Sequence, residues 1–235
     1  MAYSEAWPTG PKFIRTDAAP LLTTDTVLLA DFVRLRGGNG LCGDIGTGSG
    51  ALILLLAEKH LGYKFCGFEL SSDAAKAANA NLELNGLSGR AEIITGDITE
   101  TCALFGRGSF DSLVSNPPYF PADSNPSPNT ARNYARRGLE PLELCRAASY
   151  LLKNGGFFSL VYRTERLAEL FRAMSDNLIE PKRLKLFAKN EKTPPSLALV
   201  EGRIQAKAGL KIEPALFQKN GDDSETDEYL RINHR

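Results

Sequence analysis

The chain has 235 residues, of which 43% are hydrophobic and 24% charged, and its 28 basic and 28 acidic residues give a net charge of zero. Such a chain can bury one substantial core and has no room for a separate large binding domain. The four cysteines are far apart and there are only two histidines, so the sequence favours reduced thiols and no bound metal. Without a signal peptide or a membrane-spanning apolar run, the protein is expected to be cytoplasmic.

The first part of the chain is expected to be a short irregular segment over residues 1–24, followed by a single domain over residues 25–235. Residues 1–20 are rich in proline and small side chains, which is typical of irregular structure. Thr24 or Asp25 is a suitable cap for a helix that runs to Val33 or Arg34.

A glycine-rich loop joins the first predicted strand, residues 40–45, to an apolar helix over residues 51–59. The loop reads Gly46-Thr47-Gly48-Ser49-Gly50. Glycines allow positive φ and a close approach of ligand to backbone, and the first turn of the helix favours an anionic or carboxylate group. The spacing also satisfies the relaxed dinucleotide fingerprint, so a nicotinamide-dependent oxidoreductase stays open at this point. A Walker loop is excluded because no Gly-Lys-Ser/Thr follows.

Two acidic residues end the next two predicted strands. Glu69 closes the strand over residues 63–69, about 20 residues beyond the glycine loop, the spacing at which an acid accepts from ribose hydroxyls. Asp97 closes the strand over residues 91–97. Ligands of open α/β sheets bind at the carboxyl ends of strands, so both acids are candidate ligand contacts. For each acid alone, a helix cap or a solvated strand end is the alternative.

The fourth predicted strand, residues 110–114, is followed by Ser115-Asn116-Pro117-Pro118-Tyr119-Phe120. The Asn116 side-chain oxygen and the Pro117 carbonyl can each accept one hydrogen from a planar amine, and consecutive prolines hold these acceptors still. Tyr119 supplies a flat face for the ring that carries the amine. This motif predicts transfer of an electrophilic methyl group to an amine, and the alternative is an ordinary turn that ends a strand.

The rest of the chain continues to alternate strands and helices, which predicts a doubly wound, largely parallel sheet. Helices are expected at about 72–85 and 164–176, and a strand at 155–162. Two strands at 184–187 and 196–202 are expected to form an antiparallel pair. The polar segment between Tyr119 and Arg137 is long enough to be a functional loop or lid.

Basic residues occur in two clusters despite the zero net charge. The first, after the Asn-Pro-Pro-Tyr motif, contains Arg132, Arg136, Arg137 and Arg146, and the second contains Lys182, Arg183, Lys185, Lys189 and Lys192. Either cluster could follow an RNA backbone. For the second cluster, a solvated basic face is an equally good interpretation.

Taken together, the motifs Asp44-x-Gly46-Thr47-Gly48-Ser49-Gly50, Glu69, Asp97 and Asn116-Pro117-Pro118-Tyr119 resemble those of class I S-adenosylmethionine-dependent methyltransferases that modify amino nitrogens. Residues 22–30, Tyr119-Phe120, Ala135-Arg136 and residues 225–229 are most similar to the bacterial tRNA1(Val) (adenine-37-N6)-methyltransferase family. The resemblance covers roughly residues 11–231. It implies a Rossmann-like fold with a mostly parallel seven-stranded sheet, a C-terminal antiparallel hairpin and helices on both faces.

The resemblance also implies roles for individual residues. Asn116, Pro117 and Tyr119 would be catalytic, and Phe120, Arg132, Arg136 and Arg137 would contact the RNA substrate. The cofactor, S-adenosyl-L-methionine, would be bound by Asp44, Gly46, Thr47, Gly48 and Gly50 at its methionine end, by Glu69 and Leu70 near the ribose, by Asp97 and Ile98 near the adenine, and by Asn116. No metal is expected.

The sequence departs from the family pattern in two places. Gly43 replaces a large aliphatic residue, which is expected to loosen strand packing only. The Arg136-Arg137-Gly138 stretch lies on the substrate side and leaves the identity of the RNA open. The leading interpretation is therefore N6-methylation of a tRNA adenine by an enzyme favoured to be a monomer. Alternatives are guanine N2 of RNA or a protein glutamine as substrate and, in a different class, an oxidoreductase or a non-catalytic cofactor-binding protein.

Overall fold

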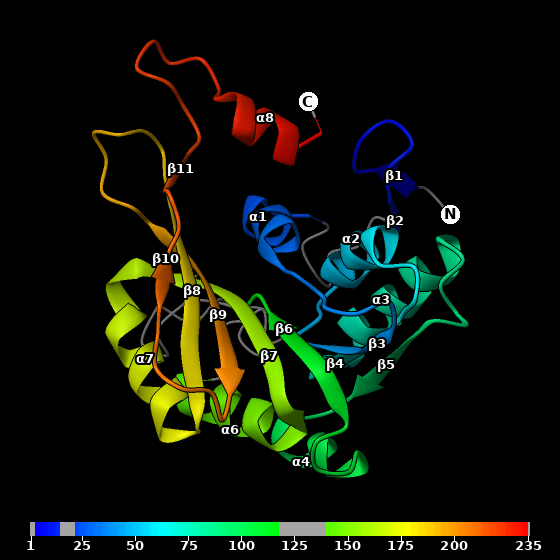
Figure 1. Cartoon of the computed structure of the whole chain (residues 1–235). Helices are drawn as coiled ribbons and strands as arrows, with labels where there is room; N and C mark the ends of the chain where they lie inside the picture. The colour runs from blue at the N-terminus through cyan, green and yellow to red at the C-terminus, as the bar shows by residue number, and fades with distance from the viewer. Residues whose placement is uncertain (1–2, 15–21, 118–139, 235) are drawn as a thin grey trace, which may run out of the picture.

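The computed structural model describes residues 3–14, 22–117 and 140–234. Its centre is a nine-stranded sheet in the order β10-β8-β9-β7-β6-β3-β4-β5, with β11 also paired to β8 (Figure 1). The strands are β3 (Gly40–Ile45), β4 (Tyr63–Glu69), β5 (Ala91–Thr95), β6 (Phe110–Ser115), β7 (Leu152–Arg163), β8 (Ile179–Ala188), β9 (Leu197–Ile204), β10 (Lys211–Ile212) and β11 (Leu216–Phe217).

The sheet has a parallel part and a C-terminal antiparallel part. Strands β3 to β7 pair in parallel, whereas β9 is antiparallel to both β7 and β8. The predicted doubly wound sheet and its C-terminal antiparallel pair are thereby confirmed. Two strands of two residues each, β10 and β11, lie along the outer side of β8, and they were not expected because so short a segment has no recognisable period.

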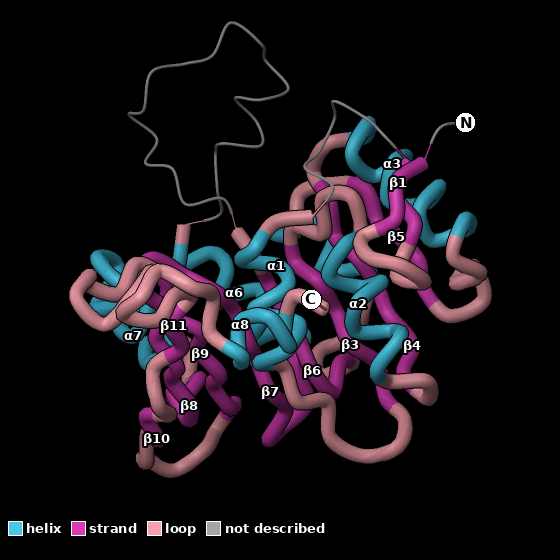
Figure 2. Tube along the Cα trace, turned by 90° about the horizontal axis from the view of Figure 1, so that it is seen from above, coloured by secondary structure: helices cyan, strands magenta, loops and turns pink. Residues whose placement is uncertain are grey.

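Helices cover both faces of the sheet (Figure 1). Helices α1 (Thr24–Phe32), α2 (Ala51–Lys59) and α3 (Ser72–Leu84) lie on one face, and α4 (Ile98–Thr101), α6 (Pro141–Leu151) and α7 (Leu167–Asp176) lie on the other. Short 3-10 turns, η1 (Cys102–Leu104) and η2 (Thr164–Arg166), follow α4 and precede α7. The last helix, α8 (Asp227–Ile232), lies beside α1 (Figure 2).

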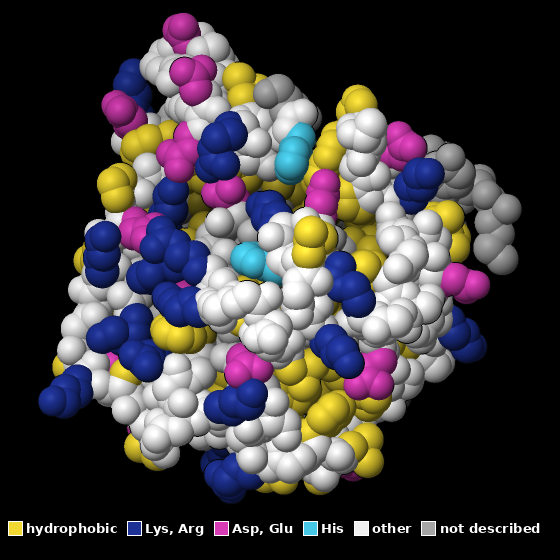
Figure 3. All heavy atoms as spheres, turned by 45° about the vertical axis from the view of Figure 1, so that its right-hand side comes forward, with side chains coloured by type: hydrophobic (Ala, Val, Ile, Leu, Met, Phe, Trp, Pro, Cys, Tyr) yellow, Lys and Arg dark blue, Asp and Glu magenta, His cyan; other side chains and the backbone are white. Residues whose placement is uncertain are grey.

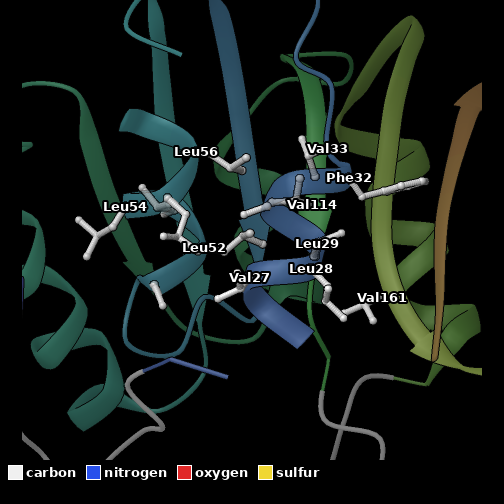
Figure 4. Packing of buried hydrophobic residues seen from close by; sticks show 14 of the residues in the cluster. Val27, Leu28, Leu29, Phe32, Val33, Leu52, Leu54, Leu56, Val114 and Val161 are labelled. Atoms are coloured by element: carbon white, nitrogen blue, oxygen red, sulfur yellow. The ribbon is translucent and has the colours of Figure 1, made fainter. Parts of the chain in front are cut away.

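The hydrophobic core has one layer on each face of the sheet. In the first layer, α1 and α2 pack side by side, α1 over β7 and β9 and α2 over β4. Leu29, Leu52, Leu56 and Val114 are among the side chains that meet there (Figure 4). All residues of α2 from 51 to 57 are buried, because the sheet covers one side of this helix and its neighbours cover the others. The burial of α1 and α2 fixes the position of the first turn of α1 and of the glycine loop before α2.

The N-terminal segment, expected to be irregular, instead contains an antiparallel hairpin of β1 (Tyr3–Glu5) and β2 (Lys12–Ile14). Asn81 of α3 and Asn85, the C-cap of this helix, hold the hairpin in place. The Asn85 side chain accepts from the Lys12 N–H (2.9 Å) and donates to the Lys12 carbonyl (2.7 Å), while Asn81 Oδ1 accepts from the Ile14 N–H (2.7 Å). These partners lie 67 and 73 residues away in the sequence, so no local pattern predicts the hairpin.

Gly43 does not loosen the sheet, contrary to the expectation from sequence. A Cβ atom at this position would lie 2.5 Å from Leu113 Cδ2 and 3.1 Å from the nearest ring carbons of Phe110. The neighbouring side chains therefore already occupy the space that a larger residue would need. The glycine is required by the packing on β6 rather than being a defect in it.

This packing predicts that Gly43→Ala destabilises the protein, because the added methyl group forces Leu113 or Phe110 out of place. Overpacking of this kind costs about 1–3 kcal/mol of the free energy of unfolding. Urea unfolding followed by circular dichroism measures the change. The matched control is Gly38→Ala, since a Cβ at Gly38 meets nothing within 4 Å, and equal stability of the two variants would contradict the prediction.

Candidate active site

The four motifs meet at one edge of the sheet. Strands β6, β3, β4 and β5 are neighbours in that order and run in parallel, so their carboxyl ends lie side by side. The glycine loop follows β3, Glu69 ends β4, Asp97 follows β5 and Asn116 follows β6. The structure thus brings these predicted site residues together, as expected for ligand-binding groups of an open α/β sheet.

The glycine loop presents an open backbone surface. Gly46, Gly48 and Gly50 have φ values of 78°, 57° and 78°, in the left-handed region that favours glycine. A Cβ at Gly46 or Gly48 would meet nothing within 4 Å, so a ligand can approach the backbone there directly. The Gly46 and Thr47 N–H groups both donate to the Phe68 carbonyl, at 2.9 and 3.0 Å, and attach the loop to β4.

Glu69 connects the glycine loop to the start of α3. Its Oε2 accepts from the Gly48 N–H (2.8 Å) and its Oε1 accepts from the Ser71 N–H (2.9 Å). Each carboxylate oxygen has two lone pairs, so both oxygens keep acceptor capacity for hydroxyl groups of a ligand. The carboxylate is held in position from two sides before any ligand arrives.

Asp44 lies beneath the loop and is 2% exposed. Its Oδ2 accepts from Thr47 Oγ1 at 2.7 Å. Burial raises the pKa of Asp44 to about 7. The Thr47 hydrogen bond lowers this pKa and the nearby charge of Glu69 raises it, but burial is the largest effect. The folded protein therefore gains or loses a proton at this site near neutral pH.

The groups after β4 and β5 differ in their surroundings. Asp97 Oδ1 accepts from both the N–H and the Oγ1 of Thr99 (2.8 Å each), so Asp97 is the N-cap of α4, which was the alternative for this acid. Leu70 is 49% exposed and offers an apolar surface at the end of β4, whereas Ile98 is buried in the core on the second face of the sheet.

Asn116 is fixed by its neighbours at the end of β6. The Ser115 hydroxyl donates to the Ile45 carbonyl (2.7 Å), which joins the ends of β6 and β3, and Pro117 is buried. The Asn116 amide nitrogen Nδ2 donates to Thr26 Oγ1 in the first turn of α1 (2.9 Å). The predicted site residues Tyr119, Phe120, Arg132, Arg136 and Arg137 lie outside the described residues.

Two residues at this edge were not singled out from the sequence. Thr26 contacts Asn116, and Asn81, which is completely buried, donates from Nδ2 to the Ser49 carbonyl of the glycine loop (2.9 Å). The contact partner of Thr26 is 90 residues away and that of Asn81 is 32 residues away. The only local signal was an apolar helix face around each polar residue.

Two members of the second basic cluster, Arg183 and Lys185, form ion pairs within the protein. Arg183 is 6% exposed and pairs with Glu201 and Glu213 at 3.0 Å each, and Lys185 pairs with Glu228 at 2.6 Å. In Figure 3, Lys and Arg side chains gather on the left of the face shown, and acidic side chains lie among and around them. Arg146 of the first cluster is exposed on α6.

A sheet of this order, with a glycine loop after β3 and acidic residues after the next two strands, has the arrangement of the class I methyltransferase fold. A solved structure of similar fold is a predicted O-methyltransferase of Agrobacterium tumefaciens, with a TM-score of 0.74 at 22% identity over 89% of this chain and 95% of that one. Another is a geranyl diphosphate C-methyltransferase of Streptomyces coelicolor bound to S-adenosyl-L-homocysteine, with a TM-score of 0.56 at 14% identity over 77% of this chain and 79% of that one.

The family model of the methyltransferase small domain matches residues 23–178. The tRNA1(Val) (adenine(37)-N6)-methyltransferase of Porphyromonas gingivalis strain W83 is 34% identical over 72% of this chain and 71% of its own length, and that of Bacteroides thetaiotaomicron is 32% identical over 73% and 72%. The chain belongs to the methyltransferase small-domain family and, within it, to the family of these bacterial tRNA methyltransferases. Among the described residues, no helix combines the length and apolar character needed to cross a membrane.

The raised pKa of Asp44 predicts a pH-dependent stability. Its ordinary value is 3.8, so between about pH 4 and pH 7 the folded state holds a proton that the unfolded state has lost, and the unfolding free energy falls as the pH rises through this window. As the pH rises from about 4 to about 7, the free energy of unfolding of the wild type should fall relative to that of Asp44→Asn, by at most about 1.4 kcal/mol per pH unit. Above pH 7 the difference between the two proteins should stay constant. Urea unfolding of both proteins without cofactor measures it, and parallel pH profiles would contradict the prediction.

Proposed function

We propose that the protein transfers a methyl group from S-adenosylmethionine to N6 of an adenine in tRNA, namely adenine 37 of tRNA1(Val). The observation that carries this proposal is the position of Asn116 and the buried Pro117 at the same sheet edge as the open glycine loop. The names of the related enzymes supply the nucleotide and the RNA. As a tRNA-modifying enzyme, the protein would act in the cytoplasm, and a monomer suffices because one chain contains all the groups at this edge.

The residues at the edge fit S-adenosylmethionine. The open space over Gly46 and Gly48 accommodates a ligand that a side chain would exclude, and Glu69 is held with acceptor capacity at the end of β4. Leu70 offers a half-exposed apolar surface to a flat ring. When bound, the cofactor supplies a methyl group on a sulfonium centre, which makes the methyl carbon electrophilic.

The individual residues then have defined roles. Glu69 accepts hydrogen bonds from the ribose hydroxyls, and the glycine loop, with Asp44 and Thr47 beneath it, holds the methionine end. Asp97 accepts from the amino group of the cofactor adenine with the carboxylate oxygen that does not cap α4. These contacts fix the direction from which the methyl group faces Asn116.

Asn116 and Pro117 act on the substrate amine. The side-chain oxygen of Asn116 and the Pro117 carbonyl each accept one N6 hydrogen, which turns the nitrogen lone pair out of the ring plane and toward the methyl carbon. The bound cofactor would supply the methyl carbon for the new N–C bond and keep the electron pair of the broken C–S bond on its sulfur, and the extra N6 proton would leave to water. Tyr119 and Phe120 would stack on the unstacked adenine, and Arg132, Arg136 and Arg137 would contact phosphates.

The proposal predicts that wild-type protein forms N6-methyladenosine in tRNA isolated from cells that lack this modification. In Asn116→Ala the amine loses one acceptor while Glu69 and the glycine loop are unchanged, so turnover should fall at least about 100-fold with nearly unchanged S-adenosylmethionine affinity. Nucleoside mass spectrometry measures the product, and isothermal titration calorimetry measures cofactor binding.

The outcomes separate the parts of the proposal. Cofactor binding without any methylated nucleoside in tRNA would contradict the tRNA assignment and direct the search to guanine N2 of other RNA or to protein glutamine. Equal loss of cofactor binding and turnover in Asn116→Ala would assign Asn116 a structural role.

A further inference from the structure

The first turn of α1 contacts the proposed catalytic asparagine directly. Asn116 Nδ2 donates to Thr26 Oγ1 at 2.9 Å, and Thr26 is 7% exposed. The two residues are 90 positions apart in the sequence, and α1 meets the end of β6 only because both belong to the same packed layer. This hydrogen bond therefore depends on the tertiary structure alone.

Thr26 is itself held by the cap of its helix. Its Oγ1 lies 2.9 Å from Thr23 Oγ1, and its N–H donates to the same Thr23 oxygen (3.3 Å), which makes Thr23 the N-cap of α1. Either hydroxyl can be the donor in the Thr23–Thr26 contact, because Thr26 Oγ1 has two lone pairs and can accept from Asn116 in both cases. The contact with Thr23 therefore holds Thr26 Oγ1 in place beside the Asn116 amide.

The hydrogen bond from Nδ2 to Thr26 Oγ1 determines which end of the Asn116 amide faces α1. A carboxamide is planar and carries its donor and its acceptor on opposite sides, so with Nδ2 bonded to Thr26 the oxygen Oδ1 points away from the helix. Methyl transfer needs Oδ1, and not Nδ2, toward the amine, because the amine hydrogens require an acceptor. If the Asn116 amide were rotated by half a turn, its Nδ2 donor would face the hydrogens of the substrate amine, which are donors too.

The position of Thr26 is fixed by the packing on both sides of it. The next residues, Val27, Leu28 and Leu29, are buried in the core that α1 shares with α2 and β6 (Figure 4). On the other side, the Ser115 hydroxyl fixes the backbone next to Asn116 through the Ile45 carbonyl. Neither partner of the Thr26–Asn116 hydrogen bond can move far without disturbing the core.

We propose that Thr26 is a positioning residue for methyl transfer, which holds the Asn116 amide with Oδ1 toward the substrate amine. The inference rests on the proposed role of Asn116 and adds to it a residue that touches neither cofactor nor substrate. Removal of the Thr26 hydroxyl should therefore reduce turnover without reducing cofactor affinity, since neither Glu69 nor the glycine loop has a hydrogen bond with Thr26.

The test compares three single variants with wild type in the tRNA methylation assay. Thr26→Val keeps the shape of the side chain and removes the hydroxyl, Thr26→Ser keeps the hydroxyl, and Thr24→Val makes the same change at a half-buried threonine of the same helix turn whose side chain has no hydrogen bond to another described residue. For Thr26→Val, kcat should fall about 10- to 100-fold, as expected for a misplaced catalytic group. Its KM for S-adenosylmethionine should stay unchanged, and both Thr26→Ser and Thr24→Val should resemble wild type.

A double-mutant cycle and a spectroscopic readout separate positioning from general damage. If Thr26 acts through Asn116, adding Thr26→Val to Asn116→Ala should cause no further loss of turnover. In 15N-labelled protein, the side-chain NH2 signals of Asn116, assigned as those absent from Asn116→Ala, should shift in Thr26→Val and not in Thr24→Val. This second measurement does not depend on the substrate, and Thr26→Ala provides it should the valine variant fail to fold.

Unchanged turnover and unchanged Asn116 NH2 signals in Thr26→Val would overturn the inference, as would additive losses in the double variant. A wild-type level of activity in Asn116→Ala would instead refute the proposed function of Asn116. If tRNA is not methylated at all, the NH2 signals still decide whether Thr26 orients the amide.

Discussion

The parallel register of four strands is the constraint on which the rest of the site depends. Asp44 of β3 pairs with Gly67 of β4 and with Val114 of β6, and Glu69 at the end of β4 pairs with Thr95 of β5. Because the strands run the same way and are in step, their carboxyl ends form one line of loops. A shift of one residue in any strand would turn its side chains to the opposite face and break up this line.

The polar groups along this line maintain the fold as well as facing the ligand. Glu69 joins the glycine loop to α3, Asp97 caps α4, and Asn116 bonds to α1. A group that is already bonded loses little conformational freedom when the ligand arrives, which reduces the entropic cost of binding. The proposed cofactor site and the proposed catalytic amide therefore belong to the same hydrogen-bonded edge of the sheet.

Charge is distributed differently from what the sequence clusters indicated. Arg183, counted among candidate RNA contacts, lies inside the protein between Glu201 and Glu213, and it also donates to the Phe32 carbonyl at 3.0 Å. Arg183 thereby links β8 to β9 and to the C-terminal end of α1, the helix that carries Thr26 in its first turn. Arg183 thus supports the site indirectly, and because it is buried it is not available to contact RNA.

The sequence by itself determined the parallel strands β3 to β7, the glycine loop with its helix, the acids at the strand ends and the Asn-Pro-Pro-Tyr motif, because each depends on a local pattern of period, glycine or proline. It also placed the C-terminal antiparallel pair. Only the tertiary structure decided the N-terminal hairpin held by Asn81 and Asn85, the tight packing at Gly43 and the bond between Thr26 and Asn116. In each of these cases the partner lies far away in the sequence, and only the packing of helices on the sheet brings the two groups within hydrogen-bond or van der Waals distance.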